Sequence, residues 1–287
     1  MFSQPFHILP PSRWPFFLAI SLLITVHGLL LSWSGLGYRW FCVGAYPFLI
    51  IACLWFSDIS RESHLGGFHS IPVQSGLRIG FCLFILSEIM FFFGFFWAYL
   101  HCSLSPNIEL GCSWPPPGLK PIVFHTLPLL NTLLLLTSGA TLTWSHYLLS
   151  AFSHPPIKID DPIIRHLSWA PLLPTKILRP NHFISALLLA VTILLGLIFL
   201  IIQLFEYSLA SFTIADSSFG SCFYIATGFH GLHVFIGCLF LLVSLLRLTS
   251  FHFTSTRHLG LEFAIWYWHF VDVIWLLLFL IIYCWGS

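Results

Sequence analysis

The chain carries very little charge. Only eleven basic and ten acidic side chains occur among its 287 residues, whereas 58% of the residues are apolar and 18% are aromatic. A soluble domain of this size would need more polar surface. The net charge of +1, without a clustered basic face, also argues against nucleic-acid binding. The composition therefore predicts a polytopic membrane protein.

Cysteine pairing patterns and a cleavable leader are not visible either. The eight cysteines are scattered, mostly within apolar runs, and no C-x-x-C occurs. We interpret them as small buried apolar side chains. The first fourteen residues hold one arginine, two adjacent prolines and no small-residue cleavage site, so we expect the mature chain to begin near Met1.

Long apolar runs, in contrast, are abundant. A bilayer core needs about 20 apolar residues per helix, and seven runs approach or exceed that length without the alternation expected of barrel strands. We predict an all-α fold with spans near residues 15–34, 40–57, 79–103, 127–150, 182–206, 218–246 and 263–284. We expect one membrane domain over 1–287, with helices 1–2 over about 15–63 and helices 3–7 over about 72–285.

The basic residues predict the orientation of these spans. Lys and Arg accumulate on the side from which helices insert. With the N-terminus inside, nine of the eleven basic residues fall on the inner side, and only Arg39 and Lys120 fall outside. The inner set is Arg13, Arg61, Arg78, Lys158, Arg165, Lys176, Arg179, Arg247 and Arg257. We predict that the N-terminus is inside and the C-terminus outside.

Two connecting segments differ from the others. Residues 104–126 contain a proline triplet, which forbids helix and favours an extended outer loop. Residues 151–181 are long, polar and proline-rich, and we expect an extended inner-side loop there.

Acidic residues within a bilayer are costly and therefore informative. Glu88 lies inside an apolar run, FILSEIMFFF, whereas Asp58, Glu206, Asp216 and Glu262 lie near span ends. We predict that Glu88 is a buried carboxylate and that it is protonated at neutral pH, because an ionised group there would lack the water it needs.

Histidine pairs suggest polar contacts between helices. His230 and His233 are three residues apart, which places both rings on one helical face. A haem would need opposed ligands and a zinc site at least a third protein ligand, and no such set has a recognisable spacing. Small residues around the pair favour interhelical hydrogen bonding instead. We expect a similar polar contact for His269 and Asp272.

Four stretches, together with the start Pro11–Pro15, resemble a known family. They are LRIGFCLFILSEIMFFFGFFWAYLH, LLNTLLLLTSGATLTWSH, FTIADSSFGSCFYIATGFHGLHVFIG and FHFTSTRHLGLEFAIWYWHFVDVIWLLLFLIIYCWGS. In this order they are similar to the signature segments of subunit III of the mitochondrial haem-copper oxidases, the cytochrome c oxidases. The blocks cover more than half of the chain.

The resemblance implies a fold and a setting. Members have seven transmembrane helices in two bundles, helices 1–2 and helices 3–7, around a lipid-filled cleft. Their N-terminus lies on the matrix side of the mitochondrial inner membrane and their C-terminus on the intermembrane-space side. Partners would be the oxidase subunits 1 and 2, accessory subunits, membrane lipids and other respiratory complexes.

The resemblance also implies a function. The whole complex transfers electrons from cytochrome c to dioxygen, forms water and pumps protons. Its third subunit binds structural phospholipids but no haem and no copper, since haem a and copper are held by partner subunits. It would stabilise the catalytic subunit and support proton uptake and oxygen access. We therefore expect no catalytic residue and no metal ligand in this chain.

Site residues can be carried over by position. The family's reactive carboxylate, which hydrophobic carbodiimides label, corresponds to Glu88. The lipid-binding residues would be Trp55, Arg61, Glu62, His69, Arg78, Glu88, Arg247 and His252. The alternative for each arginine is a simple topology anchor, and for Glu88 a hydrogen bond without a proton-transfer role.

The chain departs from the family in several places. Trp55-Phe56-Ser57-Asp58 lacks one basic residue of the usual segment, and Phe68-His69 has one imidazole where the family has two. Trp144-Ser145-His146-Tyr147 also differs, and residues 151–181 are longer than the usual connection. The changed residues predict a lipid chemistry that differs from that of the family. The longer loop predicts contact with a lineage-specific partner subunit.

Three other functions fit less well. A quinol-oxidising relative often lacks the first two spans, which are present here. A transporter or channel would need a continuous polar pathway, and a single mid-span acid does not supply one. A seven-helix receptor has its N-terminus outside, against the distribution of basic residues.

Overall fold

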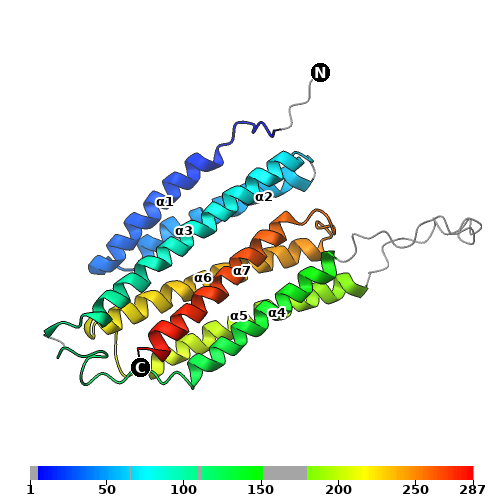
Figure 1. Ribbon diagram of the computed structural model, residues 1–287. Coiled ribbons are helices and arrows are strands. Elements are labelled where there is room, and N and C mark those ends of the chain that lie inside the picture. The colour runs from blue at the N-terminus through cyan, green and yellow to red at the C-terminus, as the bar shows by residue number, and fades with distance from the viewer. Residues whose placement is uncertain (1–5, 65, 109–110, 151–179, 287) are drawn as a thin grey trace, which may run out of the picture. The chain divides into compact units, whose positions relative to one another are not determined.

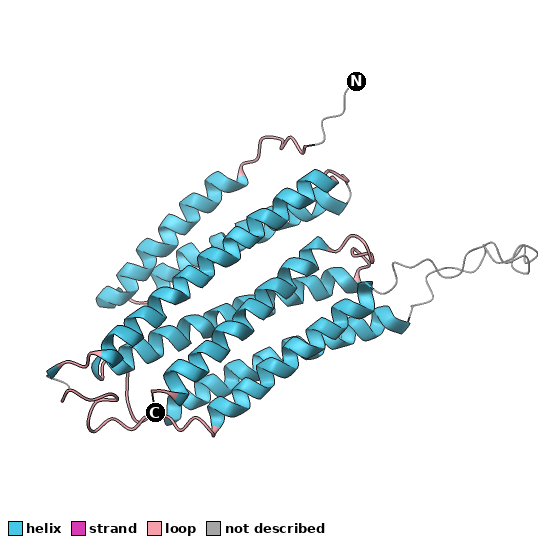
Figure 2. Cartoon of the chain, viewed as in Figure 1, coloured by secondary structure: helices cyan, strands magenta, loops and turns pink. Residues whose placement is uncertain are grey.

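A computed structural model of the chain describes residues 6–64, 66–108, 111–150 and 180–286. Within these ranges the regular structure is entirely helical, and Figure 2 shows helices joined by loops with no strand. Seven helices are long and apolar enough to cross a membrane. The predicted all-α fold with seven spans is therefore confirmed.

Most of the helices begin before or end after the apolar runs that predicted them, and Figure 1 shows their order along the chain. Their bounds are α1 Trp14–Leu31, α2 Arg39–His64, α3 Ile71–Leu104, α4 Leu127–Ser150, α5 Pro180–Leu209, α6 Ser217–Thr249 and α7 Leu259–Leu278. Two short π-helical segments continue α1 and α7, namely η1 Ser32–Leu36 and η6 Phe279–Cys284. The extra turns contain polar residues, such as Arg61 and Glu62 of α2 and Arg78 of α3, since a helix can continue beyond the hydrocarbon layer.

The chain forms two compact units, Met1–Gly80 and Phe81–Ser287, which we call unit 1 and unit 2. The boundary falls inside α3, so this helix contributes to both. The lipid-filled cleft and the division into bundles that the family resemblance implies stay predictions.

In unit 1, α1 and α2 pack backbone against backbone. A Cβ atom at Gly28 would collide with the backbone of Trp40 and Phe41, and one at Gly44 would collide with the backbone of Thr25. Small residues allow this close approach, which is the usual basis of helix association in a bilayer. α1 accordingly buries only Ser21 and Gly28 within the chain.

In unit 2, four helices close a ring. α4 packs on α5, α5 on α6, α6 on α7 and α7 on α4. The largest fully buried side chains at its centre are Trp268 and Trp275 of α7. Indole nitrogens in this core are satisfied across helices: Trp268 Nε1 donates to Ser138 Oγ at 2.9 Å and Trp275 Nε1 to Thr132 Oγ1 at 3.0 Å.

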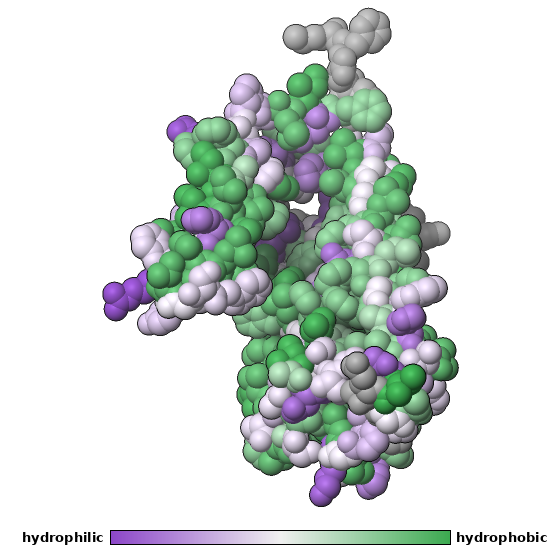
Figure 3. Space-filling model, turned by 90° about the vertical axis from the view of Figure 1, so that its left-hand side faces the viewer, coloured by the Kyte–Doolittle hydropathy of each residue, from purple (hydrophilic) through white to green (hydrophobic). Residues whose placement is uncertain are grey.

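The outer surface of both units is rich in apolar side chains. Large hydrophobic residues are exposed along all seven helices, and they occupy most of the face shown in Figure 3. A surface of this kind suits contact with lipid or with other membrane proteins. The chain is a multi-pass membrane protein.

The two unusual connections have different outcomes. Between Leu104 and Leu127 the described residues form turns and irregular structure, as the proline triplet predicted. Trp114 of this segment packs back onto α3, where its Nε1 donates to Tyr99 Oη at 3.2 Å. The predicted loop over 151–181 lies almost entirely outside the described residues.

Candidate functional site

A carboxyl–imidazole pair joins α3 to α6. Glu88 Oε2 lies 2.9 Å from His233 Nε2, and His233 Nδ1 lies 2.7 Å from the carbonyl oxygen of Phe229. Because a carbonyl can only accept, Nδ1 carries a hydrogen and donates it. One proton is then shared between Nε2 and the carboxyl group, as a neutral pair or as an ion pair. The pair can thus hold a proton at a defined place in the span.

Aromatic rings surround this pair. The His233 ring centroid lies 4.9 Å from that of Phe92 and 6.0 Å from that of Phe91. Phe95, seven residues after Glu88 on α3, stacks at 5.3 Å on Phe229, four residues before His233 on α6. The side chain of His233 is 9% exposed and that of Glu88 is 23% exposed. The carboxyl group is therefore partly accessible from the surface of unit 2, whereas its partner is enclosed.

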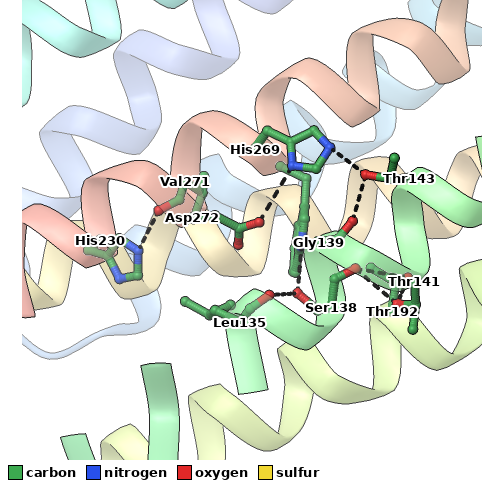
Figure 4. A network of polar contacts seen from close by, with 11 residues as sticks. Leu135, Ser138, Gly139, Thr141, Thr143, Thr192, His230, His269, Val271 and Asp272 are labelled. Atoms are coloured by element: carbon green, nitrogen blue, oxygen red, sulfur yellow. Dashed lines mark hydrogen bonds and ion pairs between the residues drawn. The ribbon is translucent and has the colours of Figure 1, made fainter. Parts of the chain in front are cut away.

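A second acidic site lies between α7 and α4 (Figure 4). Asp272 Oδ2 is 3.7 Å from His269 Nδ1, and His269 Nε2 is 3.3 Å from Thr143 Oγ1. Gly139 leaves the space for the carboxyl group, since a Cβ atom there would lie 2.7 Å from Asp272 Oδ2. The predicted polar contact of His269 with Asp272 is confirmed.

The histidine pair of α6 makes the interhelical contacts that the sequence predicted. His230 Nε2 donates to the carbonyl oxygen of Val271 at 3.2 Å, as Figure 4 shows, and His233 pairs with Glu88 as described above. In the same region Thr141 and Thr192 connect their hydroxyl groups at 2.8 Å between α4 and α5. These histidines hold helices together.

A third acid, Glu206, lies in an enclosed polar cluster. Its Oε1 accepts a hydrogen bond from Tyr283 Oη at 2.6 Å and from Gln203 Nε2 at 3.4 Å. Asn131 Nδ2 donates to Gln203 Oε1 at 3.3 Å, so the cluster connects α4, α5 and η6. Only 1% of Glu206 is exposed.

The depth of these acids corrects one expectation. Asp272 also lies in mid-span, near the middle of the apolar stretch Leu259–Cys284. Asp272 (7% exposed) and Glu206 are more deeply buried within the chain than Glu88 is. The expectation that Glu88 alone lies in mid-span is wrong, because Asp272 lies there too. The difference in burial was not predictable, since position along an apolar run does not say which face of the helix is covered.

The predicted lipid-binding residues of unit 1 gather around the end of α2 and the start of α3. Trp55 is half-buried on α2, whereas the Arg61 side chain is 71% exposed and lies 3.8 Å from Asp58. Asp58 also accepts a hydrogen bond from Trp14 Nε1 at 2.6 Å. Glu62, His69 and Arg78 are all half-buried.

In unit 2, Arg247 is fixed near the end of α6. Its guanidinium carbon lies 4.6 Å from the ring centroid of Phe253, and its Nη1 occupies the space that Gly260 leaves. The Nε atom is buried without a hydrogen-bond partner. His252 is exposed, and its backbone nitrogen donates to the Arg247 carbonyl at 2.9 Å.

Among the described residues no group of three or more His, Cys, Asp or Glu side chains is arranged to hold a metal ion. The cysteines are less buried than expected. Only Cys238 is buried within the chain, while Cys102, Cys222 and Cys284 are intermediate and the remaining four are exposed. An apolar run faces lipid on one side and other helices on the other, so the sequence alone could not tell which cysteines are buried.

Comparison with known proteins gives one consistent result. Residues 4–156 and 176–287 match the family described as cytochrome c oxidase subunit III. Similar proteins include the "Cytochrome c oxidase subunit 3" of Coturnix japonica, of Pisaster ochraceus and of Aedes aegypti. Each is 45% identical over 285 residues, which cover 99% of this chain and at least 98% of the relative.

Proposed function

Because the chain belongs to the cytochrome c oxidase subunit III family, we propose that it is the non-catalytic third subunit of an oxidase that transfers electrons from cytochrome c to dioxygen. The observation that carries this proposal is the match over nearly the whole chain, which includes all seven spans. Electron transfer and proton pumping then belong to the complex, and this subunit supports them.

The proposal includes a location and partners. We place the chain in the mitochondrial inner membrane, with its N-terminus on the matrix side, next to the oxidase subunits 1 and 2 that hold haem a and copper. The distribution of basic residues supports this orientation, since nine of eleven fall on one side.

Copurification tests this assignment directly. The chain, carrying an affinity tag, is isolated from mitochondria in a mild detergent, and the visible spectrum of the product is recorded. We expect haem a absorbance from the larger partner subunits. After the subunits are separated, we expect no stoichiometric haem or copper on this polypeptide. Metal that stays with the separated chain would refute the non-catalytic role.

We further propose that each unit binds phospholipid head groups through its predicted lipid-binding residues. A guanidinium group can hold a phosphate through two parallel hydrogen bonds. Arg61 is exposed enough to do so, and Arg247 has its guanidinium group held in place by Phe253. Bound lipid would then stabilise the catalytic subunit during turnover.

Two arginine substitutions test the lipid role. We expect Arg61→Ala and Arg247→Ala to lower the phospholipid content of the purified oxidase and to speed its inactivation during turnover, with near-normal initial activity. Matched controls are Arg39→Ala, at the other end of α2, and Arg257→Ala, ten residues after Arg247. Lipid content that mass spectrometry finds unchanged in both test variants would leave only the topology-anchor role.

Finally, we propose that Glu88 is the acid that supports proton uptake. It is the more accessible partner of the Glu88–His233 pair, and it lies in an apolar span. A hydrophobic carbodiimide that enters through the lipid should therefore label Glu88 rather than the enclosed Glu206 and Asp272.

The variant Glu88→Gln separates a proton role from a structural one. The amide keeps the shape and a hydrogen bond to His233 but cannot titrate. We expect normal assembly, no carbodiimide labelling at position 88 and at most reduced pumping. Failure of the variant to assemble, or labelling of Glu262, Glu206 or Asp272 instead, would contradict this assignment.

A further inference from the structure

Three ionisable side chains meet where α4 ends and α7 begins. His146 Nε2 lies 3.1 Å from His258 Nε2, and the two ring centroids are 5.2 Å apart. Glu262 Oε1 lies 3.7 Å from the same nitrogen of His258. The side chains of His258 and Glu262 are 8% and 18% exposed, so the contacts are largely enclosed. These three residues, which we call the histidine cluster, are not part of the acidic sites described above.

A backbone contact decides which hydrogens the histidine cluster carries. His258 Nδ1 lies 2.9 Å from the carbonyl oxygen of Thr254. Because a carbonyl can only accept, Nδ1 carries a hydrogen and donates it. In a neutral His258 ring, Nε2 is then an acceptor, and the hydrogen in the 3.1 Å contact comes from His146 Nε2. The neutral cluster therefore has one uncharged hydrogen bond between its rings.

The same geometry accepts one added proton. One ring nitrogen still donates to the other, so the bond between the rings is kept and becomes charge-assisted. The Glu262 carboxylate lies beside the new positive charge. A second proton would place hydrogen against hydrogen and charge against charge across 3.1 Å. The capacity of the histidine cluster is therefore a single proton.

From this geometry we propose that His146, His258 and Glu262 bind one proton together, and that this proton holds the end of α4 more tightly to the start of α7. Histidine suits this role because it changes charge between about pH 5 and 8. In the predicted orientation both helix ends lie on the inner side, so the contact would respond to the pH there. That location rests on the proposed function, whereas the proton site rests on the distances alone.

The other charged groups near the histidine cluster are arginines. Arg257 is exposed on the turn that leads into His258. On α6, Arg247 Nη1 would lie 2.8 Å from a Cβ atom at Gly260, which stands between His258 and Glu262 in the sequence. Both guanidinium groups keep their charge over this pH range. Among these described groups, the pH-dependent change therefore belongs to the cluster itself.

Hydrogen exchange in the intact oxidase tests this site. The amides of Leu261 and Glu262 donate to the carbonyl oxygen of His258, so their exchange reports the opening of the first turn of α7. Protection is measured by mass spectrometry at about pH 6 and about pH 8, each time relative to an unstructured peptide of the same sequence. We expect about two- to tenfold greater protection at the lower pH. The connection 210–216, which contains no histidine, should show no such difference.

Amide substitutions assign the effect to the histidine cluster. His146→Gln and His258→Gln keep a hydrogen-bonding group but cannot bind the proton, so each should remove the pH dependence of protection. Glu262→Gln removes only the negative charge and should reduce that dependence. His182→Gln is the matched control, because this ring stacks at 4.7 Å on Phe251 of the same α6–α7 connection. It should leave the pH dependence unchanged.

Three results would refute the proposal. The first is protection in the natural protein that is equal at the two pH values or greater at the higher one, and this measurement needs no variant. The second is a pH dependence that persists in both His146→Gln and His258→Gln. The third is a pH dependence that disappears in His182→Gln.

Discussion

Units 1 and 2 hold their helices together in different ways. In unit 1, α1 and α2 approach so closely at Gly28 and Gly44 that main chain lies against main chain. In unit 2, α7 buries eleven of its twenty residues, and tryptophans, hydroxyl groups and acids fill the space between helices. Since lipid tails are as apolar as leucine, neither unit can rely on hydrophobic burial alone.

The difference shows two solutions to the same problem. Close backbone approach gains dispersion contacts along the whole helix pair, but it needs glycine at fixed positions. A core of large side chains tolerates wider spacing, but each polar atom in it needs a partner. Added volume at Gly28 or Gly44 should therefore push main chain against main chain in unit 1, whereas the loss of a large core side chain should damage unit 2.

Removal of the central indole of unit 2 should have the largest effect. Trp268 is fully buried and also bonds to Ser138. We expect Trp268→Ala to destabilise unit 2 by about 3–5 kcal/mol, the usual cost of deleting a buried aromatic side chain. Thermal release of the subunit from the purified complex measures this. Trp97→Ala, at a position 66% exposed within the chain, is the matched control. An equal drop in the release temperature of both variants would argue against a side-chain core in unit 2.

Added volume at the α1–α2 contact should come next. We expect Gly28→Ala to cost about 1–3 kcal/mol, because the new methyl group must displace the main chain of Trp40. Gly80→Ala is the control, since a Cβ atom there meets nothing within 4 Å and should favour the helix. Limited proteolysis of the α1–α2 connection reports the separation of the pair. A Gly28→Ala variant as resistant as the control would show that the backbone contact is dispensable.

The loss of one interhelical hydrogen bond should have the smallest effect. Ser138→Ala removes the acceptor of Trp268 Nε1 and should cost about 1 kcal/mol. Thr137→Ala changes the neighbouring exposed position, where the hydroxyl bonds only to its own helix, and should be nearly neutral. The melting temperature of the complex distinguishes the two variants. A larger drop in melting temperature for Thr137→Ala than for Ser138→Ala would reverse the assignment of inner and outer faces on α4.

Much of this architecture could be predicted from the sequence. Counting apolar residues located all seven spans, and α4 begins and ends at the two predicted residues. The count failed at the polar ends of α2 and α3, where helix continues although apolar residues do not. The family resemblance rested on long segments, so it did not depend on these ends.

The candidate site was only partly visible in the sequence. Spacing placed His230 and His233 on one face, but the partner of His233 lies 145 residues away on another helix. The depth of Glu206 depends in the same way on which helices meet. Patterns within one helix contain no information about this, because packing between helices is decided by long-range contacts.

The backbone contact at Gly28 and Gly44 also limits which inherited missense mutations these two positions can accept. Any missense change in a glycine codon adds at least one carbon atom, so neither position has a conservative alternative. At Gly28 that carbon would fall on the main chain of Trp40, and at Gly44 on that of Thr25. The exposed Leu23 on α1, in contrast, can be replaced by several other apolar residues without a collision. Two codons of this gene should therefore tolerate far fewer inherited changes than the apolar positions around them.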